Sequence, residues 1–222
     1  MKIAVDGPAG AGKSTVSKIV AQKLNLLYID TGAMYRAITY ALIKNNVDLH
    51  NEEKIKDFIK KIDFSLKRNS ETGEMDIFIN GEKVNEQLRK KIIDLNVSLV
   101  SSYKSVREFL VKLQRKLGQE YDVILDGRDI GTVVFPDADV KFYIDASVDV
   151  RAKRRLEDKK NKEARSIEEI KKQIIKRDKL DSTRKISPLK KADDAIYIDT
   201  SNMSIDEVVN LMIQRIQSGN TE

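Results

Sequence analysis

The chain has 222 residues, of which 41% are hydrophobic, and it contains no cysteine and no tryptophan. This length and composition are typical of a globular protein with one main core, and they exclude disulfides, thiolate metal sites and cysteine nucleophiles. The single histidine, His50, lies in a polar stretch, where we expect it to be solvated. Hydrolysis by a serine-histidine pair and histidine-based zinc chemistry are therefore not expected.

The net charge is +6, from 41 Lys and Arg against 35 Asp and Glu. A positive net charge favours binding of nucleic acid, anionic lipid or small anionic substrates. The densest basic stretch, residues 151–162, contains no aromatic residue for base stacking, so we expect no nucleic-acid partner. No apolar run is long enough to span a membrane and none follows a basic start, so we expect a cytoplasmic protein without a membrane partner. Charged helix faces favour a monomer.

A glycine-rich segment directly follows the apolar residues 3–5 and fills every fixed position of the pattern G-x-x-x-x-G-K-[ST]. A strand, a glycine turn and a helix N-terminus together aim backbone N–H groups at a bound polyphosphate. Lys13 is expected to reach the β- and γ-phosphates, and Ser14 to ligate Mg²⁺. The residues predicted to bind the nucleoside triphosphate are Gly7, Pro8, Ala9, Gly10, Ala11, Gly12, Lys13, Ser14 and Thr15.

Short apolar runs that end in aspartate recur along the chain, at residues 3–6, 27–30, 123–126, 142–145 and 196–199. They predict about five buried parallel strands with helical patterns between them. The fold class is therefore α/β, a phosphate-loop fold of three layers in which helices cover both faces of the sheet. Ligands gather at the carboxyl ends of such strands, so we expect the strand-terminal aspartates to line the site. Among them, Asp126 is the candidate to order Mg²⁺-bound water, with a purely structural role as the alternative.

Several helix starts are visible as capping residues. Asn51 precedes one helical pattern, and Ser147 precedes another. Capping boxes, in which a serine is followed three residues later by glutamate, are predicted at Ser105, Ser166 and Ser204, and Gly118 is predicted to end the helix that begins at Ser105.

Residues 63–85 depart from the alternation of strands and helices. Their apolar residues alternate with period two, and the pair Asn80-Gly81 is a strong hairpin signal. The sequence therefore predicts a small antiparallel β insert.

Arginines cluster after the predicted strands. Arg36 and Arg128 follow the second and third strands, and two further groups lie on later helices: Arg151, Arg154 and Arg155, then Arg177, Asp181 and Arg184. Transfer between two phosphates requires cations around donor and acceptor together. A solvated helix face is the alternative, which we favour for Lys159, Lys160 and Lys162.

Together these motifs resemble the bacterial cytidylate kinases over nearly the whole chain. The resemblance rests on the phosphate loop, DTGAMYR at 30–36, NVS at 96–98 with VRE at 106–108, DGRDIGTVVFPDA at 126–138, RAKRR at 151–155 and R-D-x-x-D-x-x-R at 177–184. The segment 126–138 is the most specific, because adenylate and thymidylate kinases share the loop but not this sequence. The resemblance implies a single kinase core over 1–222, a nucleoside-monophosphate-binding region at 31–105 that includes the insert 63–85, and a mobile helical lid at 151–165.

The resemblance also implies roles for individual residues. The acceptor phosphate would be held by Thr31, Tyr35, Arg36 and Arg128, where Thr31 replaces the serine of many relatives. Cytosine would be read by Ser98, Arg107 and Asp129, and the sugar contacted by Arg177 and Asp181. An ion pair between Arg107 and Asp129 is the structural alternative. The implied catalytic set is Lys13, Arg128, Arg151, Arg154, Arg155 and Arg184, and the implied metal set is Ser14 and Asp126.

The expected reaction is direct transfer of the γ-phosphoryl group of ATP to CMP or dCMP, with Mg²⁺ and without a covalent intermediate. Alternatives are another small-molecule kinase of this fold, with UMP, AMP or shikimate as acceptor, a GTPase, or a nucleic-acid-dependent ATPase. The N-K-x-D tetrapeptide that reads guanine in GTPases does not occur.

Overall fold

The computed structural model describes residues 1–69, 74–157 and 166–218. The chain divides into two compact units. Unit 1 consists of Met1–Leu27 and Tyr121–Glu222, and unit 2 of Tyr28–Glu120. The predicted boundaries of the monophosphate-binding region and the lid stay predictions.

A five-stranded parallel sheet has the order β2-β6-β1-β7-β8. Its strands are β1 (Lys2–Asp6), β2 (Leu27–Asp30), β6 (Val123–Asp126), β7 (Val140–Asp145) and β8 (Ile196–Asp199). The central strand β1 pairs in parallel with β6, where Val5 aligns with Asp126, and with β7, where Asp6 aligns with Tyr143. All four residues of β6 are buried. The predicted parallel strands are confirmed.

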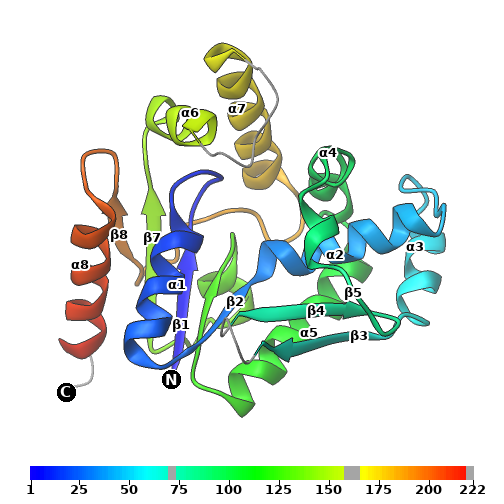
Figure 1. Cartoon of the computed structure of the whole chain (residues 1–222), viewed down its shortest axis with the longest axis horizontal. Helices are drawn as coiled ribbons and strands as arrows, with labels where there is room; N and C mark the ends of the chain where they lie inside the picture. Colours follow the sequence, from blue (N-terminus) through cyan, green and yellow to red (C-terminus); the bar gives the residue numbers. More distant parts are fainter. Residues whose placement is uncertain (70–73, 158–165, 219–222) are drawn as a thin grey trace. The chain divides into compact units, whose positions relative to one another are not determined.

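The helices of unit 1 are α1 (Lys13–Leu24), α6 (Val148–Glu157), α7 (Ile167–Thr183) and α8 (Ile205–Ser218), and a short π-helix, η2 (Ile130–Val134), follows β6. Helix α1 packs against β6 and α8, and α6 packs against α7. Figure 1 shows α6 and α7 beyond the carboxyl ends of β1 and β7. Ser147, Ser166 and Ser204 each accept a hydrogen bond from the backbone three residues later, as predicted.

Besides the last three residues of β2, the described residues of unit 2 form three antiparallel strands and four α-helices. They are α2 (Thr31–Lys44), α3 (Glu52–Ile59), β3 (Phe64–Arg68), β4 (Met75–Ile79), β5 (Glu82–Lys83), α4 (Lys91–Val100) and α5 (Lys104–Glu120), with a 3₁₀-helix η1 (Asn85–Arg89) before α4. Asn80 and Gly81 join β4 to β5 with φ of 50° and 81°, the positive values that this turn requires. Asn51 caps α3 as predicted. The β insert is confirmed, while residues 70–73 of it lie outside the described part of the chain.

The predicted capping box at Ser105 is wrong. Helix α5 begins at Lys104, and the carbonyl of Tyr103 accepts the first helical hydrogen bond, from the N–H of Arg107. The helix therefore starts before Ser105. The hydroxyl of Tyr103 donates to the carbonyl of Leu49 at 2.7 Å, a tertiary contact that local sequence does not reveal. Gly118 lies inside the helix, because one glycine costs only about 1 kcal/mol relative to alanine.

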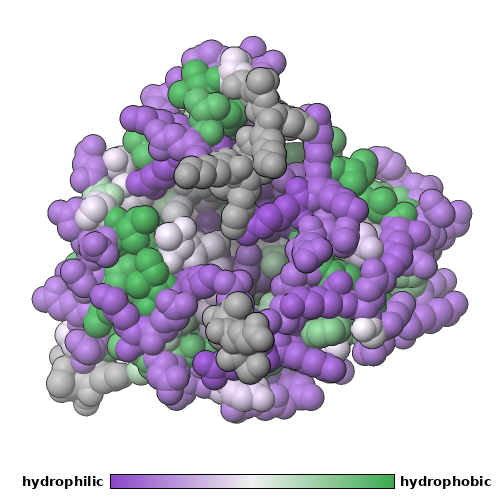
Figure 2. All heavy atoms as spheres, viewed as in Figure 1, coloured by the Kyte–Doolittle hydropathy of each residue, from purple (hydrophilic) through white to green (hydrophobic). Residues whose placement is uncertain are grey.

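Charged and polar side chains cover much of the face seen in Figure 2. Among the described residues, no helix is both long enough and apolar enough to cross a membrane.

Candidate active site

The glycine-rich loop between β1 and α1 depends on glycine at several positions. Gly7, Gly10 and Gly12 have φ of 145°, 81° and 90°, which other residues rarely adopt. A Cβ on Gly7 would lie 1.9 Å from the carbonyl oxygen of Ile144 in β7, so no side chain fits there. The loop therefore lies directly against the centre of the sheet.

Side chains of α6 and of the segment after β8 hold the carbonyl groups of this loop. Nη1 of Arg151 donates to the carbonyl of Ala9 at 3.0 Å. The carbonyl of Ala11 accepts from Nη1 of Arg154 at 3.5 Å and from Oγ1 of Thr200 at 3.2 Å. A loop that offers its N–H groups to phosphate needs other donors for its carbonyls, and these residues supply them.

Lys13 begins α1 and is buried, with 5% of its surface exposed. Its Nζ donates to the carbonyl of Pro8 at 2.7 Å. Burial, together with the nearby charge of Arg128, lowers the pKa of Lys13 to about 7. A bound polyphosphate would favour the ammonium form and raise this pKa again.

Ser14 and Asp126 meet beside the loop, where Oγ of Ser14 donates to Oδ2 of Asp126 at 2.6 Å. Asp126 is buried at the end of β6. Mg²⁺ in phosphate sites is held by few protein oxygens together with waters and substrate phosphates. A hydroxyl beside a carboxylate fits that ion, and the described residues contain no cluster of three or more His, Cys, Asp or Glu that could form a separate metal cage.

The loop after β6 is tied to the end of α7 by two ion pairs. Nε of Arg128 lies 2.9 Å from Oδ2 of Asp181, and Nη2 of Arg184 lies 3.2 Å from Oδ1 of Asp129. Arg184 and Asp129 are both nearly fully buried. The structure thus brings together four of the residues that the sequence predicts for the acceptor and for transfer.

Arg151 is more enclosed than a lid arginine was expected to be. Only 4% of it is exposed, and besides Ala9 it contacts the carbonyl of Ala146 at 2.9 Å and Oδ2 of Asp178 at 2.6 Å. Arg154 also donates to the hydroxyl and the carbonyl of Thr200, at 3.0 Å and 2.7 Å. Both arginines lie against the phosphate loop, and residues 158–165 of the predicted lid lie outside the described residues.

In unit 2, the predicted acceptor residues lie on α2, α4 and α5. The guanidinium of Arg107 lies over the ring of Tyr35, 5.3 Å from its centroid, and its Nη1 donates to the carbonyl of Ser101 at 3.1 Å. Nε of Arg36 lies 3.4 Å from Asp94, which is one helical turn before Ser98 on α4. Thr31, at the start of α2, is buried. Unit 2 thus carries several of the predicted acceptor residues on these three helices.

Sequence reasoning missed the specific partners of Asp6 and Asp178. Asp6 was expected only to line the site with the other strand-terminal aspartates, but its carboxylate accepts from the backbone N–H groups of Ile130 and Gly131. Asp178 holds Arg151. In the sequence, Asp178 lies in the arginine-rich segment 177–184, but this position does not indicate that it pairs with Arg151.

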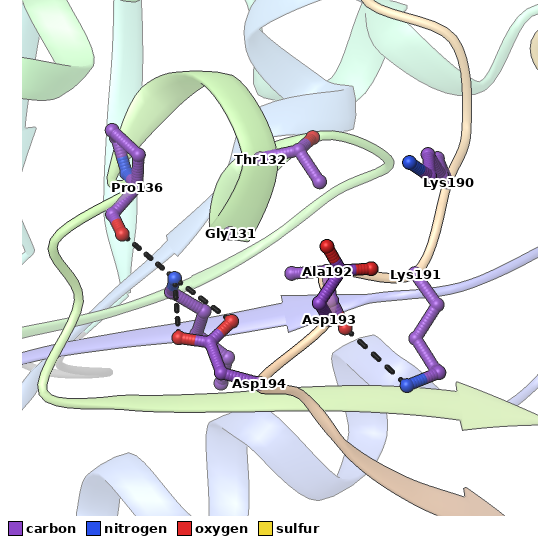
Figure 3. Close-up of a pocket in the computed structure, with 9 residues that line it drawn as sticks. Gly131, Thr132, Pro136, Lys190, Lys191, Ala192, Asp193 and Asp194 are labelled. Carbon is purple, nitrogen blue, oxygen red and sulfur yellow. Dashed lines mark hydrogen bonds and ion pairs between the residues drawn. The ribbon is translucent and has the colours of Figure 1, made fainter.

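A pocket of about 270 Å³ lies on another part of unit 1 (Figure 3). Its lining residues include Gly131, Thr132, Lys141, Lys190 and Asp194. Nζ of Lys141 donates to the carbonyl of Pro136 and to Oδ2 of Asp194, and both contacts measure 2.7 Å. No residue of the phosphate loop lines this pocket, so it is not the candidate active site.

The sheet and its glycine-rich loop define the class of protein: a parallel α/β fold whose first strand leads through a phosphate loop into a helix is that of the phosphate-loop nucleotide-binding proteins. A family model described as cytidylate kinase matches residues 3–218. The chain belongs to the cytidylate kinase family, as the sequence motifs predicted.

Curated relatives agree with this assignment. The chain is 49% identical over 211 residues to a cytidylate kinase of Clostridium botulinum (strain Loch Maree / Type A3), covering 95% of this chain and 94% of the relative. It is 52% identical over 213 residues to a bifunctional pantoate ligase/cytidylate kinase of Prochlorococcus marinus (strain MIT 9312), covering 95% of this chain. The chain spans only 42% of the length of that bifunctional relative.

Among solved structures, an uncharacterized protein from Eubacterium ventriosum ATCC 27560 has a TM-score of 0.53 at 14% identity, over 98% of this chain and 99% of that one. This likeness concerns the fold alone.

Proposed function

We propose that the chain transfers the γ-phosphoryl group of ATP to CMP or dCMP, giving ADP and the nucleoside diphosphate. The observation that carries this proposal is the match to the cytidylate kinase family over residues 3–218, which includes the phosphate loop and the segment 126–138. No residue need act as a nucleophile, because transfer of this kind depends on alignment and on stabilisation of charge.

On the donor side, residues 7–15 bind the phosphates of ATP, and Lys13 stabilises the charge on the transferred group. Ser14 and Asp126 would hold Mg²⁺, which when bound neutralises part of the phosphate charge. The 2.6 Å contact between these two side chains supports a shared role. The buried place of Lys13 strengthens its interaction with phosphate, since water is kept away.

On the acceptor side, Arg128 is suited to bind the phosphate of CMP. It uses Nε and Nη1 for Asp181 and the carbonyl of Gly127, while Nη2 has no partner among the described residues. A guanidinium can therefore contact a phosphate oxygen while it stays anchored. We propose that Thr31, Tyr35 and Arg36 complete the phosphate site.

We propose that the base is read by Ser98, Arg107 and Asp129, and that Arg177 and Asp181 contact the sugar. Cytosine offers an amino donor at position 4 and acceptors at N3 and O2. A carboxylate suits the amino group, and a guanidinium suits the acceptors. Asp129 is buried and held by Arg184, an arrangement that supports a fixed position for base recognition.

The remaining arginines are proposed to act on the transferred group. Arg184 lies at the acceptor loop, and Arg155 lies on α6 next to Arg154. Arg151 and Arg154 hold the loop carbonyls of Ala9 and Ala11, so they would reach the phosphoryl group only by exchanging these carbonyls for phosphate oxygens. We propose closure of residues 151–165 over the nucleotides as the movement that allows this exchange.

An acceptor screen tests the proposal. ATP and Mg²⁺ are supplied with CMP, dCMP, UMP, AMP, dTMP or shikimate, and ADP is measured. We expect CMP and dCMP to be the best acceptors, and Lys13→Ala to lower kcat by about 10² or more. The matched control is Lys23→Ala, an exposed lysine of the same helix. A different preferred acceptor would refute the assignment of CMP.

The same preparation tests the other classes of function. Tight GDP binding without acceptor-dependent turnover would favour a GTPase, and ATP hydrolysis stimulated by RNA or DNA would favour a nucleic-acid-dependent ATPase. We also infer a monomer in the cytoplasm, supported by the charged helix faces and by the small nucleotides proposed as partners. Sedimentation and cell fractionation measure these two properties directly.

A further inference from the structure

Asp6 connects two functional loops of unit 1. It is the last residue of β1, directly before Gly7 of the phosphate loop, and only 3% of it is exposed. Its Oδ1 accepts from the N–H of Ile130 at 2.8 Å, and its Oδ2 accepts from the N–H of Gly131 at 2.7 Å. These two N–H groups immediately follow Asp129 in the chain, so one carboxylate holds the start of the turn that carries Asp129.

Lys141 holds the same turn from the strand β7. A Cβ on Gly131 would lie 3.1 Å from Cδ of Lys141 and 3.4 Å from Oδ2 of Asp6, so the glycine lies between these two side chains. Nζ of Lys141 donates to the carbonyl of Pro136, beyond η2, at 2.7 Å. The segment from Asp129 to Pro136 is therefore held at its start by β1 and at its end by β7.

A carboxylate is a costly group to bury at this position. Burial raises the pKa of Asp6 to about 7, although the two backbone N–H groups act in the opposite direction. A neutral side chain would avoid the desolvation cost, but an amide offers one acceptor oxygen where two adjacent N–H groups need acceptors. Asp6 therefore supplies the two acceptor oxygens that the turn needs, although burial of a carboxylate is unfavourable.

We propose that Asp6 is a positioning residue for the acceptor nucleotide: it fixes the turn that bears Arg128 and Asp129 to the strand that leads into the phosphate loop. The acceptor-binding side chains then keep a constant place relative to the loop that binds the donor. This inference rests on the proposed function of Arg128 and Asp129. Asp6 itself acts through the backbone of Ile130 and Gly131 and touches no reacting atom.

The test compares Asp6→Asn with Asp139→Asn. Asp139 also accepts a backbone N–H of a β1 residue, that of Lys2 at 2.6 Å, but at the opposite end of the strand. Calorimetric titration gives the dissociation constants of CMP and of a non-hydrolysable ATP analogue. We expect Asp6→Asn to weaken CMP binding by about tenfold or more, with the ATP analogue changed by less than about threefold, since small misplacements of binding groups have large effects. Asp139→Asn is expected to change neither.

Hydrogen exchange at Ile130 and Gly131, measured without any nucleotide, provides a second readout. Asp6→Asn is expected to speed exchange at both amides. If the wild-type protein fails to bind CMP, the proposed function fails, and the exchange result alone decides whether Asp6 fixes the turn. Unchanged exchange, or equal loss of CMP and ATP affinity in a folded variant, would overturn the inference.

A second variant covers the case in which Asp6→Asn does not fold. Gly131→Ala keeps Asp6 but pushes the turn away from it and from Lys141, because the new methyl group needs a few tenths of an ångström of space. It is expected to weaken CMP binding more than binding of the ATP analogue. Normal affinity for CMP in this variant would contradict the positioning role.

Discussion

Oγ of Ser14 donates a 2.6 Å hydrogen bond to Oδ2 of Asp126, so that the first turn of α1 is joined to the end of β6. Two residues that are 112 positions apart in the chain thereby form one oxygen-rich site next to the phosphate loop. This pairing supports the proposed Mg²⁺ site, because a hydroxyl and a carboxylate are ligands that this ion accepts.

Asp126→Asn should raise the Mg²⁺ concentration needed for half-maximal activity, because the neutral amide attracts the cation or its bound water less strongly. We expect a rise of about tenfold. Activity is measured across a Mg²⁺ titration at saturating ATP and CMP. Asp137→Asn, a change at an exposed carboxylate, is the control. If Asp126→Asn shows the wild-type Mg²⁺ dependence, Asp126 has a purely structural role.

Asp129→Ala should reduce the preference for CMP over UMP. Uracil presents a carbonyl at position 4 and an N–H at N3, which mismatch a carboxylate and a guanidinium, and such mismatches discriminate by up to about 10⁴. The variant is therefore expected to lose kcat/KM for CMP far more than for UMP. Steady-state kinetics with both acceptors measure the change. Equal losses for the two substrates in a folded protein would show that Asp129 does not read the base.

Arg151→Ala should destabilise the fold and weaken ATP binding together. The substitution leaves the partly exposed Asp178 without its ion pair and the carbonyl of Ala9 without this donor, and an unsatisfied buried polar group costs about 1–3 kcal/mol. Denaturant unfolding measures the free energy, and titration with an ATP analogue measures binding. Lys153→Ala, a change at an exposed lysine of the same helix, is the matched variant and should change stability much less. If the free energy of unfolding of Arg151→Ala equals that of the wild-type protein, the contacts of Arg151 with the loop contribute little to stability.

The stability of the wild-type protein relative to Asp6→Asn should fall as the pH rises from about 4 to about 7. Burial raises the pKa of Asp6 from 3.8 to about 7, so the folded state retains a proton that the unfolded state has already lost in this range. Unfolding free energy then decreases with pH. The nearby Asp129 raises and Lys13 lowers this pKa.

The measurement is the Tm of both proteins at several pH values. The difference, wild type minus variant, should decrease by several degrees across this range, since one kcal/mol shifts the Tm of a protein of this size by about 2–4 °C. A difference that stays constant with pH would contradict the raised pKa of Asp6.

Much of the fold could be predicted from local sequence patterns. Period-two alternation and the pair Asn80-Gly81 indicated the β insert, and apolar runs ending in aspartate indicated the parallel strands, because these features reflect backbone geometry and burial within a few residues. The phosphate loop was visible for the same reason: its glycines meet local requirements for positive φ and for space.

Side-chain partners could not be predicted in this way. Asp6 was visible as a strand end, but its hydrogen bonds to Ile130 and Gly131 join residues more than 120 positions apart. The enclosure of Arg151 by Ala9 and Asp178 likewise depends on how α6 and α7 pack.

The start of α5 shows the same limit, because the contact between Tyr103 and Leu49 lies outside the local pattern that suggested Ser105. The sequence by itself determined the class of fold, the phosphate loop and the family, since these depend on short segments whose backbone needs particular residues. Only the tertiary structure decided which charges are paired and which carbonyls are held, because these contacts form between segments that packing alone brings together.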